Sequence, residues 1–216
     1  VKAVREAQMI IFPGGFSGGD EPEGSGKFIA SFFRNPALME ATNDLIRNRD
    51  GLILGICNGF QALIKLGLVP FGEIRPLDST CPTLTYNAIG LHRSCYVRTR
   101  VASVKSPWLA NCSLGEEHVI PISHGEGRFA ADEATLARLI ANGQIAFQYV
   151  DASGKPSMET GANPPGSLFA IEGITSPDGR VLGKMGHTER CGALVGRNIP
   201  GNKFQPLFEA GVAYFR

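Results

Sequence analysis

The segment Leu52-Ile53-Leu54-Gly55-Ile56-Cys57-Asn58-Gly59-Phe60-Gln61 connects an apolar run to a helical pattern through a cysteine. The unbroken apolar run over residues 52–56 predicts a buried strand. Residues 58–66 bear apolar side chains at helical spacing and are followed by Gly67, which predicts a helix that ends at a glycine. Cys57 therefore lies on a turn from strand to helix, in the pattern Gly-x-Cys-x-Gly.

A cysteine on such a turn has the geometry of a nucleophile. The turn pushes the side chain out of the sheet edge, and glycines at 55 and 59 remove Cβ atoms that would clash there. The N-terminus of the following helix faces the thiol and favours the reactive thiolate, and the N–H of Asn58 can face an oxyanion. The alternative is a buried structural cysteine beside packing glycines, and the pentapeptide by itself leaves both open.

A nucleophilic cysteine requires a base, and the base requires an orienting group. The chain has four histidines, at positions 92, 118, 124 and 187. His187 follows an apolar run, and Glu189 lies two residues further, on the same side of an extended backbone. His124 has a carboxylate at the same spacing, Glu126, and is the rival base. A surface histidine beside a surface glutamate remains the alternative for both.

The remaining pattern indicates an α/β fold with a mixed sheet, because strands alternate with helices early and form hairpins late. The expected strands, beyond the one before Cys57, are Met9–Phe12, Ser94–Val104, His118–Ile122, Ile145–Val150, Leu168–Thr175 and Val181–Met185. The expected helices are Pro36–Arg49, Asp132–Ala141 and Gln205–Phe215. Without repeats or a low-complexity linker, residues 1–216 are expected to form a single domain.

Composition excludes several classes of protein. Of 216 residues, 43% are hydrophobic and 19% are charged, with a net charge of +1, so neither a nucleic-acid partner nor a membrane partner is expected. Five cysteines without a CxxC pair favour free thiols and a cytoplasmic location. The chain begins at Val1 rather than at methionine, which suggests the C-terminal part of a longer polypeptide.

Five motifs occur in order along nearly the whole chain, and their combination is more specific than any one of them. They are Pro13-Gly14-Gly15-Phe16-Ser17, Gly55-Ile56-Cys57-Asn58-Gly59-Phe60-Gln61, His124-Gly125-Glu126-Gly127, Asn163-Pro164-Pro165-Gly166-Ser167 and Gly186-His187-Thr188-Glu189-Arg190. Together they resemble the class I (triad) glutamine amidotransferases, and more narrowly the glutaminase domain of phosphoribosylformylglycinamidine synthase.

The resemblance implies catalytic roles for matching positions. Cys57 matches the nucleophile that forms a glutamyl thioester, His187 the general base and acid, and Glu189 the carboxylate that orients it. The N–H groups of Gly15 and Asn58 match the oxyanion hole.

The resemblance also implies a substrate site and demotes His124 from base to binding residue. The residues matched to glutamine binding are Gln61, Ser123, His124, Gly125 and Glu126. The implied fold is a flavodoxin-like three-layer α/β fold around a mixed, mostly parallel sheet, with the family's N-terminal strand missing from this chain.

The implied reaction is hydrolysis of glutamine to glutamate and ammonia. The ammonia would pass to an ATP-dependent formylglycinamide ribonucleotide synthetase domain or subunit. No cofactor is expected in this domain, whereas ATP and magnesium are expected in the synthetase. The alternatives are a γ-glutamyl hydrolase or cysteine peptidase built on the same turn, and a non-catalytic domain that binds and regulates a synthetase.

Two departures from the family pattern stand out. Gly186 and Thr188 replace prolines that commonly flank the catalytic histidine, which could loosen its loop. Gly18 replaces a common tyrosine, and residues 20–27 could form a variant lid.

Three other patterns are set aside. Gly125-x-Gly127-x-x-Ala130 lacks the acidic partner of a dinucleotide site. The stretch Gly24-Ser25-Gly26-Lys27 lacks both the first glycine and the Ser/Thr of a phosphate loop. The cysteines and His92 lack zinc-ligand spacing.

Overall fold

A computed structural model describes residues 1–15 and 25–216 of the chain. The helices of this part are α1 (Lys2–Glu6), α2 (Lys27–Phe33), α3 (Pro36–Arg47), α4 (Asn58–Leu66), α5 (Leu68–Phe71), α6 (Glu133–Ala141) and α7 (Leu207–Ala213), with 3₁₀ turns η1 (Pro107–Leu109) and η2 (Leu168–Ala170). The strands are β1 (Met9–Phe12), β2 (Leu52–Ile56), β3 (Thr83–Tyr86), β4 (Arg93–Val101), β5 (Glu117–His124), β6 (Glu126–Ala130), β7 (Ile145–Tyr149), β8 (Ile171–Thr175) and β9 (Val181–Lys184).

The central sheet has seven strands in the order β1-β2-β9-β8-β7-β4-β5, and β3 pairs with β6 in a separate ribbon. The β1–β2 and β2–β9 pairings are parallel, and the other four central pairings are antiparallel. The mixed α/β sheet expected from the sequence is therefore confirmed. Fewer of its strand pairings are parallel than expected, because strands in the later part of the chain are joined by hairpins.

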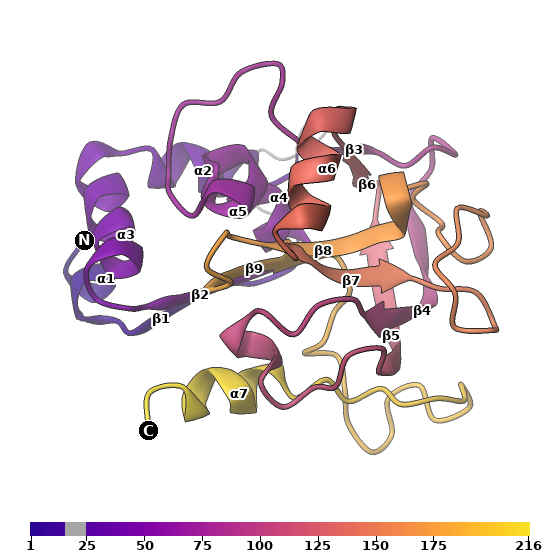
Figure 1. Cartoon of the computed structure of the whole chain (residues 1–216). Coiled ribbons are helices and arrows are strands. Elements are labelled where there is room, and N and C mark those ends of the chain that lie inside the picture. Colours follow the sequence, from indigo (N-terminus) through magenta and orange to yellow (C-terminus); the bar gives the residue numbers. More distant parts are fainter. Residues whose placement is uncertain (16–24) are drawn as a thin grey trace.

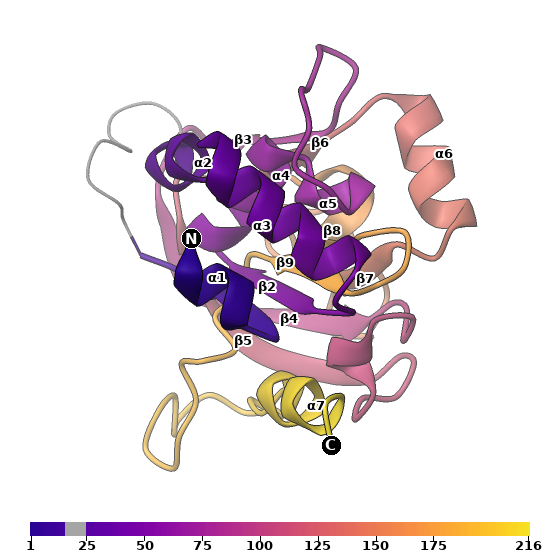
Figure 2. The same ribbon diagram turned by 90° about the vertical axis from the view of Figure 1, so that its left-hand side faces the viewer.

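Helices cover both faces of this sheet (Figures 1 and 2). Helix α4 packs on β1, β2 and β9, and α5 packs on β8 and β9. Helix α7 lies on the other side of the sheet with η1, whose Trp108 is fully buried and donates to the carbonyl oxygens of Ile53 and Arg180 at 3.1 and 3.2 Å. The apolar run of β2 is thus buried on both faces, as its sequence predicts.

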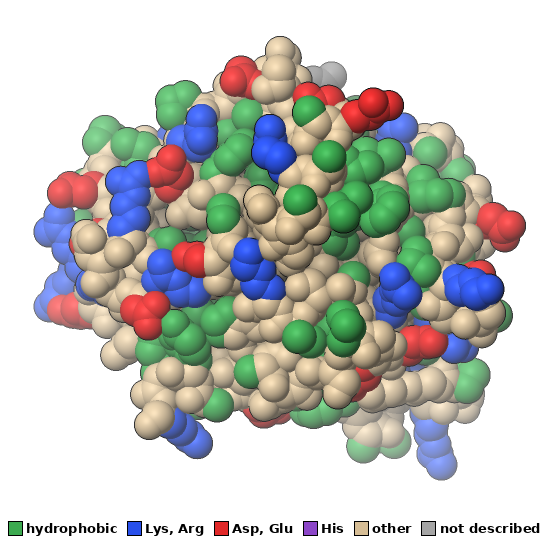
Figure 3. All heavy atoms as spheres, in the orientation of Figure 1, with side chains coloured by type: hydrophobic (Ala, Val, Ile, Leu, Met, Phe, Trp, Pro, Cys, Tyr) green, Lys and Arg blue, Asp and Glu red, His purple; other side chains and the backbone are tan. Residues whose placement is uncertain are grey.

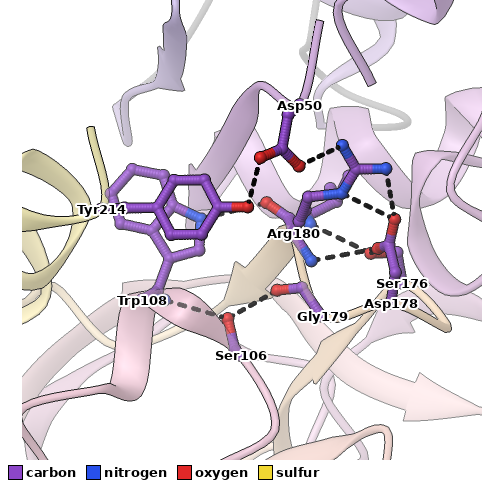
Figure 4. Close-up of polar contacts among 9 residues, drawn as sticks. Asp50, Ser106, Trp108, Ser176, Asp178, Gly179, Arg180 and Tyr214 are labelled. Carbon is purple, nitrogen blue, oxygen red and sulfur yellow. Dashed lines mark hydrogen bonds and ion pairs between the residues drawn. The ribbon is translucent and has the colours of Figure 1, made fainter. Parts of the chain in front are cut away.

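A polar cluster lies at the amino ends of the parallel strands β2 and β9 (Figure 4). The guanidinium group of Arg180 is 3.0 Å from Asp50 and 2.8 Å from Asp178. The hydroxyl of Tyr214 donates to Asp50 at 2.9 Å. These contacts connect the α3–β2 turn, the β8–β9 hairpin and the residue after α7.

Most of the expected elements are confirmed, with small shifts at their ends. The elements that were not expected are α2, α5, β3, β6 and the 3₁₀ turn η1. The last helix is shorter than the predicted Gln205–Phe215 because Pro206 caps it and residues 214–216 leave it. The predicted strand Leu168–Thr175 is also partly wrong, because residues 168–170 form the 3₁₀ turn η2.

Hydrophobic, basic and acidic side chains are interspersed on the surface seen in Figure 3. Across the described parts of the chain, none of the helices has the length and apolar character needed to cross a membrane.

Candidate active site

Cys57 occupies the expected turn between β2 and α4, with φ 52° and ψ −107°. This backbone conformation is strained for a residue with a side chain. The turn is tight because α4 starts directly under β1: a Cβ at Gly59 would lie 2.0 Å from the carbonyl oxygen of Phe12. The Cys57 N–H donates to the Lys184 carbonyl at 2.8 Å, which fixes the turn against the end of β9.

His187 lies just beyond the end of β9, next to Cys57. Its Nδ1 is 2.6 Å from Oε1 of Glu189, as the spacing of the two residues predicts. A Cβ at Gly14 would lie 2.6 Å from Cε1 of His187 and 3.3 Å from Cβ of Cys57, so both side chains flank the β1 turn. His187 is 1% exposed, and its Nε2 has no hydrogen-bond partner among the described residues. That nitrogen is available to a reacting group.

The Glu189 carboxylate is held in its charged form. Burial is the largest single influence and acts to raise its pKa, but the hydrogen bond with His187, a backbone hydrogen bond and the nearby His187 and Lys184 together outweigh it, and the pKa lies below its usual value. A charged carboxylate on Nδ1 keeps the proton there and leaves Nε2 as the acceptor.

The Cys57 side chain is held as the protonated thiol rather than as the thiolate. Burial raises its pKa to about 11, while the N–H groups of Asn58 and Gly15 act in the opposite direction. The N–H of Asn58 at the helix terminus acts toward thiolate, as expected, but desolvation is the larger effect and the net shift favours the thiol. The thiol donates to the Ser123 carbonyl at 3.6 Å. Attack on a substrate therefore requires a base to remove the proton.

The Gly15 and Asn58 N–H groups converge on the sulfur of Cys57. Gly15 has φ +108°, a conformation that suits glycine and turns its N–H toward the site. Two donors from different turns at one sulfur form the geometry of an oxyanion hole.

The loop of His187 is anchored, in spite of the glycine and threonine that flank this histidine. The Thr188 hydroxyl donates to Oε1 of Gln205 at 2.6 Å, and both side chains are buried. The His187 N–H donates to the Pro121 carbonyl at 2.9 Å. Gly186 and Thr188 suggested a loose loop, but hydrogen bonds hold this loop on both sides of His187.

The expected substrate segment, residues 123–126, forms the turn between β5 and β6. The Gln61 amide donates to the Glu126 carbonyl, so the first turn of α4 is connected to this segment. Asn87, which follows β3, donates to the His124 carbonyl at 2.8 Å and accepts from the Gly127 N–H at 3.2 Å. Asn87 was not predicted, because its sequence neighbourhood carries no motif and its role depends on the β3–β6 pairing.

His124 is buried and neutral. Burial lowers its pKa to about 3, with His92 and His187 acting in the same direction. Its Nδ1 is 3.1 Å from Oδ1 of Asn87, and a Cβ at Gly127 would lie 2.2 Å from the ring.

A small cavity of about 100 Å³ opens over the sulfur of Cys57. It is lined by seven of the candidate site residues, by Ser25 of the suggested lid segment 20–27 and by Arg190: Gly15, Ser25, Cys57, Gln61, Ser123, His124, Gly125, His187 and Arg190. No role was predicted for Arg190, although it ends the motif that contains His187. Residues from five separated segments thus lie around one thiol.

Several expectations concern other ligands or undescribed residues. Residues 126–130 of the glycine pattern form strand β6, where a dinucleotide site needs a turn that opens a helix. Within residues 1–15 and 25–216, no group of three or more His, Cys, Asp or Glu is arranged to hold a metal ion. Gly18 and most of the suggested lid, residues 20–24, lie outside the described residues.

Comparison with known proteins also indicates a glutamine amidotransferase. A family model described as a CobB/CobQ-like glutamine amidotransferase domain matches residues 2–215. The phosphoribosylformylglycinamidine synthase subunit PurQ of Synechococcus elongatus is 40% identical over 194 residues, which cover 89% of this chain and 75% of that protein. The subunit PurQ of Trichormus variabilis is 39% identical over 212 residues, 97% of this chain and 82% of that protein.

Solved structures agree. A chain of PurLQS from Thermotoga maritima superposes with a TM-score of 0.67 at 27% identity and covers 97% of this chain and 80% of its own. The glutaminase domain of Trypanosoma brucei CTPS, with bound acivicin, has a TM-score of 0.50 at 16% identity, covering 98% of this chain and 74% of its own, a likeness of fold alone.

Proposed function

The chain belongs to the family of CobB/CobQ-like glutamine amidotransferase domains, and on this premise we propose that it hydrolyses glutamine through a thioester on Cys57. The observation that carries the proposal is the arrangement around one thiol. A histidine whose Nδ1 is held at 2.6 Å by a carboxylate leaves its Nε2 unpartnered, and two N–H groups converge on the sulfur.

The reaction begins with the protonated thiol. His187 removes the proton as the sulfur of Cys57 attacks the side-chain amide carbon of glutamine, since a thiol with a pKa of about 11 is a weak nucleophile at neutral pH. The N–H groups of Gly15 and Asn58 bind the oxyanion. The imidazolium then protonates the leaving ammonia, and the neutral imidazole activates the water that hydrolyses the thioester.

The substrate amino acid is held by the segment 123–126 and by Gln61. Backbone groups of the β5–β6 turn would receive the α-carboxylate of glutamine. Gln61 acts from the first turn of α4, where its amide already contacts the Glu126 carbonyl. When the α-carboxylate is held in this way, the side-chain amide of glutamine is directed at Cys57.

The ammonia is used by a synthetase. Relatives about 40% identical carry the name phosphoribosylformylglycinamidine synthase subunit PurQ, which supports formylglycinamidine ribonucleotide synthesis as the fate of the ammonia. ATP and magnesium act in the synthetase part. Residues 1–216 act as one glutaminase domain, and a reaction that depends on a free thiol suits the reducing cytoplasm.

The test measures both halves of the reaction in the complete protein that carries this chain, assembled with its synthetase. Cys57→Ala should abolish glutamine-dependent amidine formation and leave ammonia-dependent formation unchanged. A diazo-ketone analogue of glutamine should label Cys57 and not the exposed Cys191. Glutamine turnover that survives Cys57→Ala, or labelling at Cys191, would contradict the proposal. Cleavage of γ-glutamyl peptides in place of glutamine would favour a peptidase.

A further inference from the structure

A buried ion pair lies directly beneath the loop of the catalytic histidine. Lys184 ends β9 and Glu172 lies in the neighbouring β8, and both side chains are 0% exposed. Their Nζ and Oε1 atoms are 3.4 Å apart. Neither residue takes part in the reaction described above.

The pair holds both polar ends of one residue, Gly186. Oε1 of Glu172 accepts from the Gly186 N–H at 2.5 Å, and Nζ of Lys184 donates to the Gly186 carbonyl at 2.7 Å. Gly186 immediately precedes His187. Gly186 is also packed closely against Ile120: a Cβ built on this glycine would lie 2.0 Å from Cδ1 of Ile120. The glycine therefore has no room to move in that direction.

Lys184 also contacts the nucleophile turn. Its backbone carbonyl accepts the N–H of Cys57 at 2.8 Å, while its side chain holds Gly186. One residue therefore connects the backbone of the nucleophile to the residue before the base. The glycine at 186 supplies no rigidity of its own, so the position of His187 depends on these contacts.

Stability alone does not account for the pair. Burial lowers the pKa of Lys184, and Glu172 opposes that shift, so the ammonium pays a desolvation cost. Oε2 of Glu172 has no hydrogen-bond partner among the described residues. Apolar residues of similar size commonly replace such a pair without loss of stability.

We propose that Lys184 and Glu172 are positioning residues that clamp the Gly186 peptide and thereby set His187 over the thiol of Cys57. The inference rests on the proposed glutaminase function, whose catalytic groups it orients. Removal of the clamp should impair the proton transfers more than the binding of glutamine, because the pair holds Gly186, next to the base, whereas Gln61 and Asn87 hold the substrate segment 123–126.

The experiment compares stability with turnover in the complete protein. Lys184→Met and Glu172→Leu each leave one buried charge unpaired, and both should lower the unfolding temperature. The double variant Lys184→Met/Glu172→Leu, whose apolar side chains are similar in size to the pair, should recover most of that temperature. Its kcat for glutamine should nevertheless stay about 10- to 100-fold below the parent, with KM within about three-fold, since a small misplacement of a catalytic group has this effect.

Two further variants make the result interpretable. Leu139→Ala in α6 creates a cavity in the core away from the loop, and it should lower the unfolding temperature with kcat unchanged. Lys184→Met/Glu172→Gln keeps an acceptor for the Gly186 N–H and loses the donor to its carbonyl, so its kcat should lie between the parent and the first double variant. Should the first double variant fail to fold, this one carries the test.

A double variant with kcat within about two-fold of the parent, or one whose loss is entirely in KM, would overturn the clamp. Cys57→Ala separates this failure from that of the glutaminase assignment. If Cys57→Ala abolishes turnover while the double variant retains it, the clamp is wrong and the glutaminase stands. If turnover survives Cys57→Ala, the glutaminase assignment fails first.

Discussion

The two ends of the parallel strands β2 and β9 hold polar groups in opposite ways. At the amino ends, Arg180 contacts Asp50 and Asp178 near the surface, and Tyr214 completes the cluster (Figure 4). At the carboxyl ends, Cys57 and His187 are almost fully buried, and His187 keeps a nitrogen without a partner. The amino end satisfies its charges and supports the fold, whereas the carboxyl end leaves groups unsatisfied for a substrate.

Among changes at either end of these strands, replacement of His187 should have the largest effect on activity. His187→Gln removes the base for a thiol whose pKa is about 11, so glutamate release at saturating glutamine should fall by about 10³-fold. Glu189→Gln, which leaves the base in place, should cost less. A His187→Gln protein with more than a tenth of the parent rate would show that the thiol finds another base.

Acid should destabilise the carboxyl end selectively. In the unfolded chain His124 binds a proton near pH 6.5, but burial lowers its folded-state pKa to about 3, so the unfolded state gains the proton first as the pH falls. The free energy of unfolding should therefore drop by about 2 kcal/mol between pH 8 and pH 5 on account of His124. Chemical denaturation at several pH values measures this, and His124→Gln should flatten the profile; an unchanged slope would contradict the burial of a neutral ring.

The backbone strain at Cys57 should be measurable as stability. With φ 52° at this position, Cys57→Gly should be more stable than Cys57→Ala by about 1 kcal/mol, although both are inactive. Ala41→Gly, at a buried position inside the regular helix α3, is the matched control and should lose stability. Equal stability of the two Cys57 variants would show that the turn relaxes without cost.

The amino end should affect stability and leave catalysis unchanged. Arg180→Ala removes contacts with two carboxylates from a side chain that is 18% exposed, and should lower the free energy of unfolding by about 1 kcal/mol with kcat within two-fold. Arg98→Ala, which breaks the more exposed pair with Glu117, should cost less. A large fall in kcat for Arg180→Ala would mean that the two ends are coupled through the strands.

The sequence predicts the strand–Cys57–helix turn to the residue, because a buried strand, a glycine-flanked cysteine and an amphipathic helix are all local patterns. It misses β3 and β6, whose pairing joins segments some 40 residues apart, and with them Asn87. The raised pKa of Cys57 and the contact of Lys184 with Gly186 also depend on burial by distant strands. A single lysine at the end of the apolar strand 181–184 was the available signal for the clamp.

The hydrogen bond between Thr188 and Gln205 gives the chain a tolerance to cleavage. The backbone between these residues runs along the surface, with Leu194 79% exposed, and is open to a protease or an inserted domain. A cut there would leave the Thr188 contact and the packing of α7 against Trp108 in place. The two fragments should stay associated, so this segment is a rational break point for a split version of the enzyme.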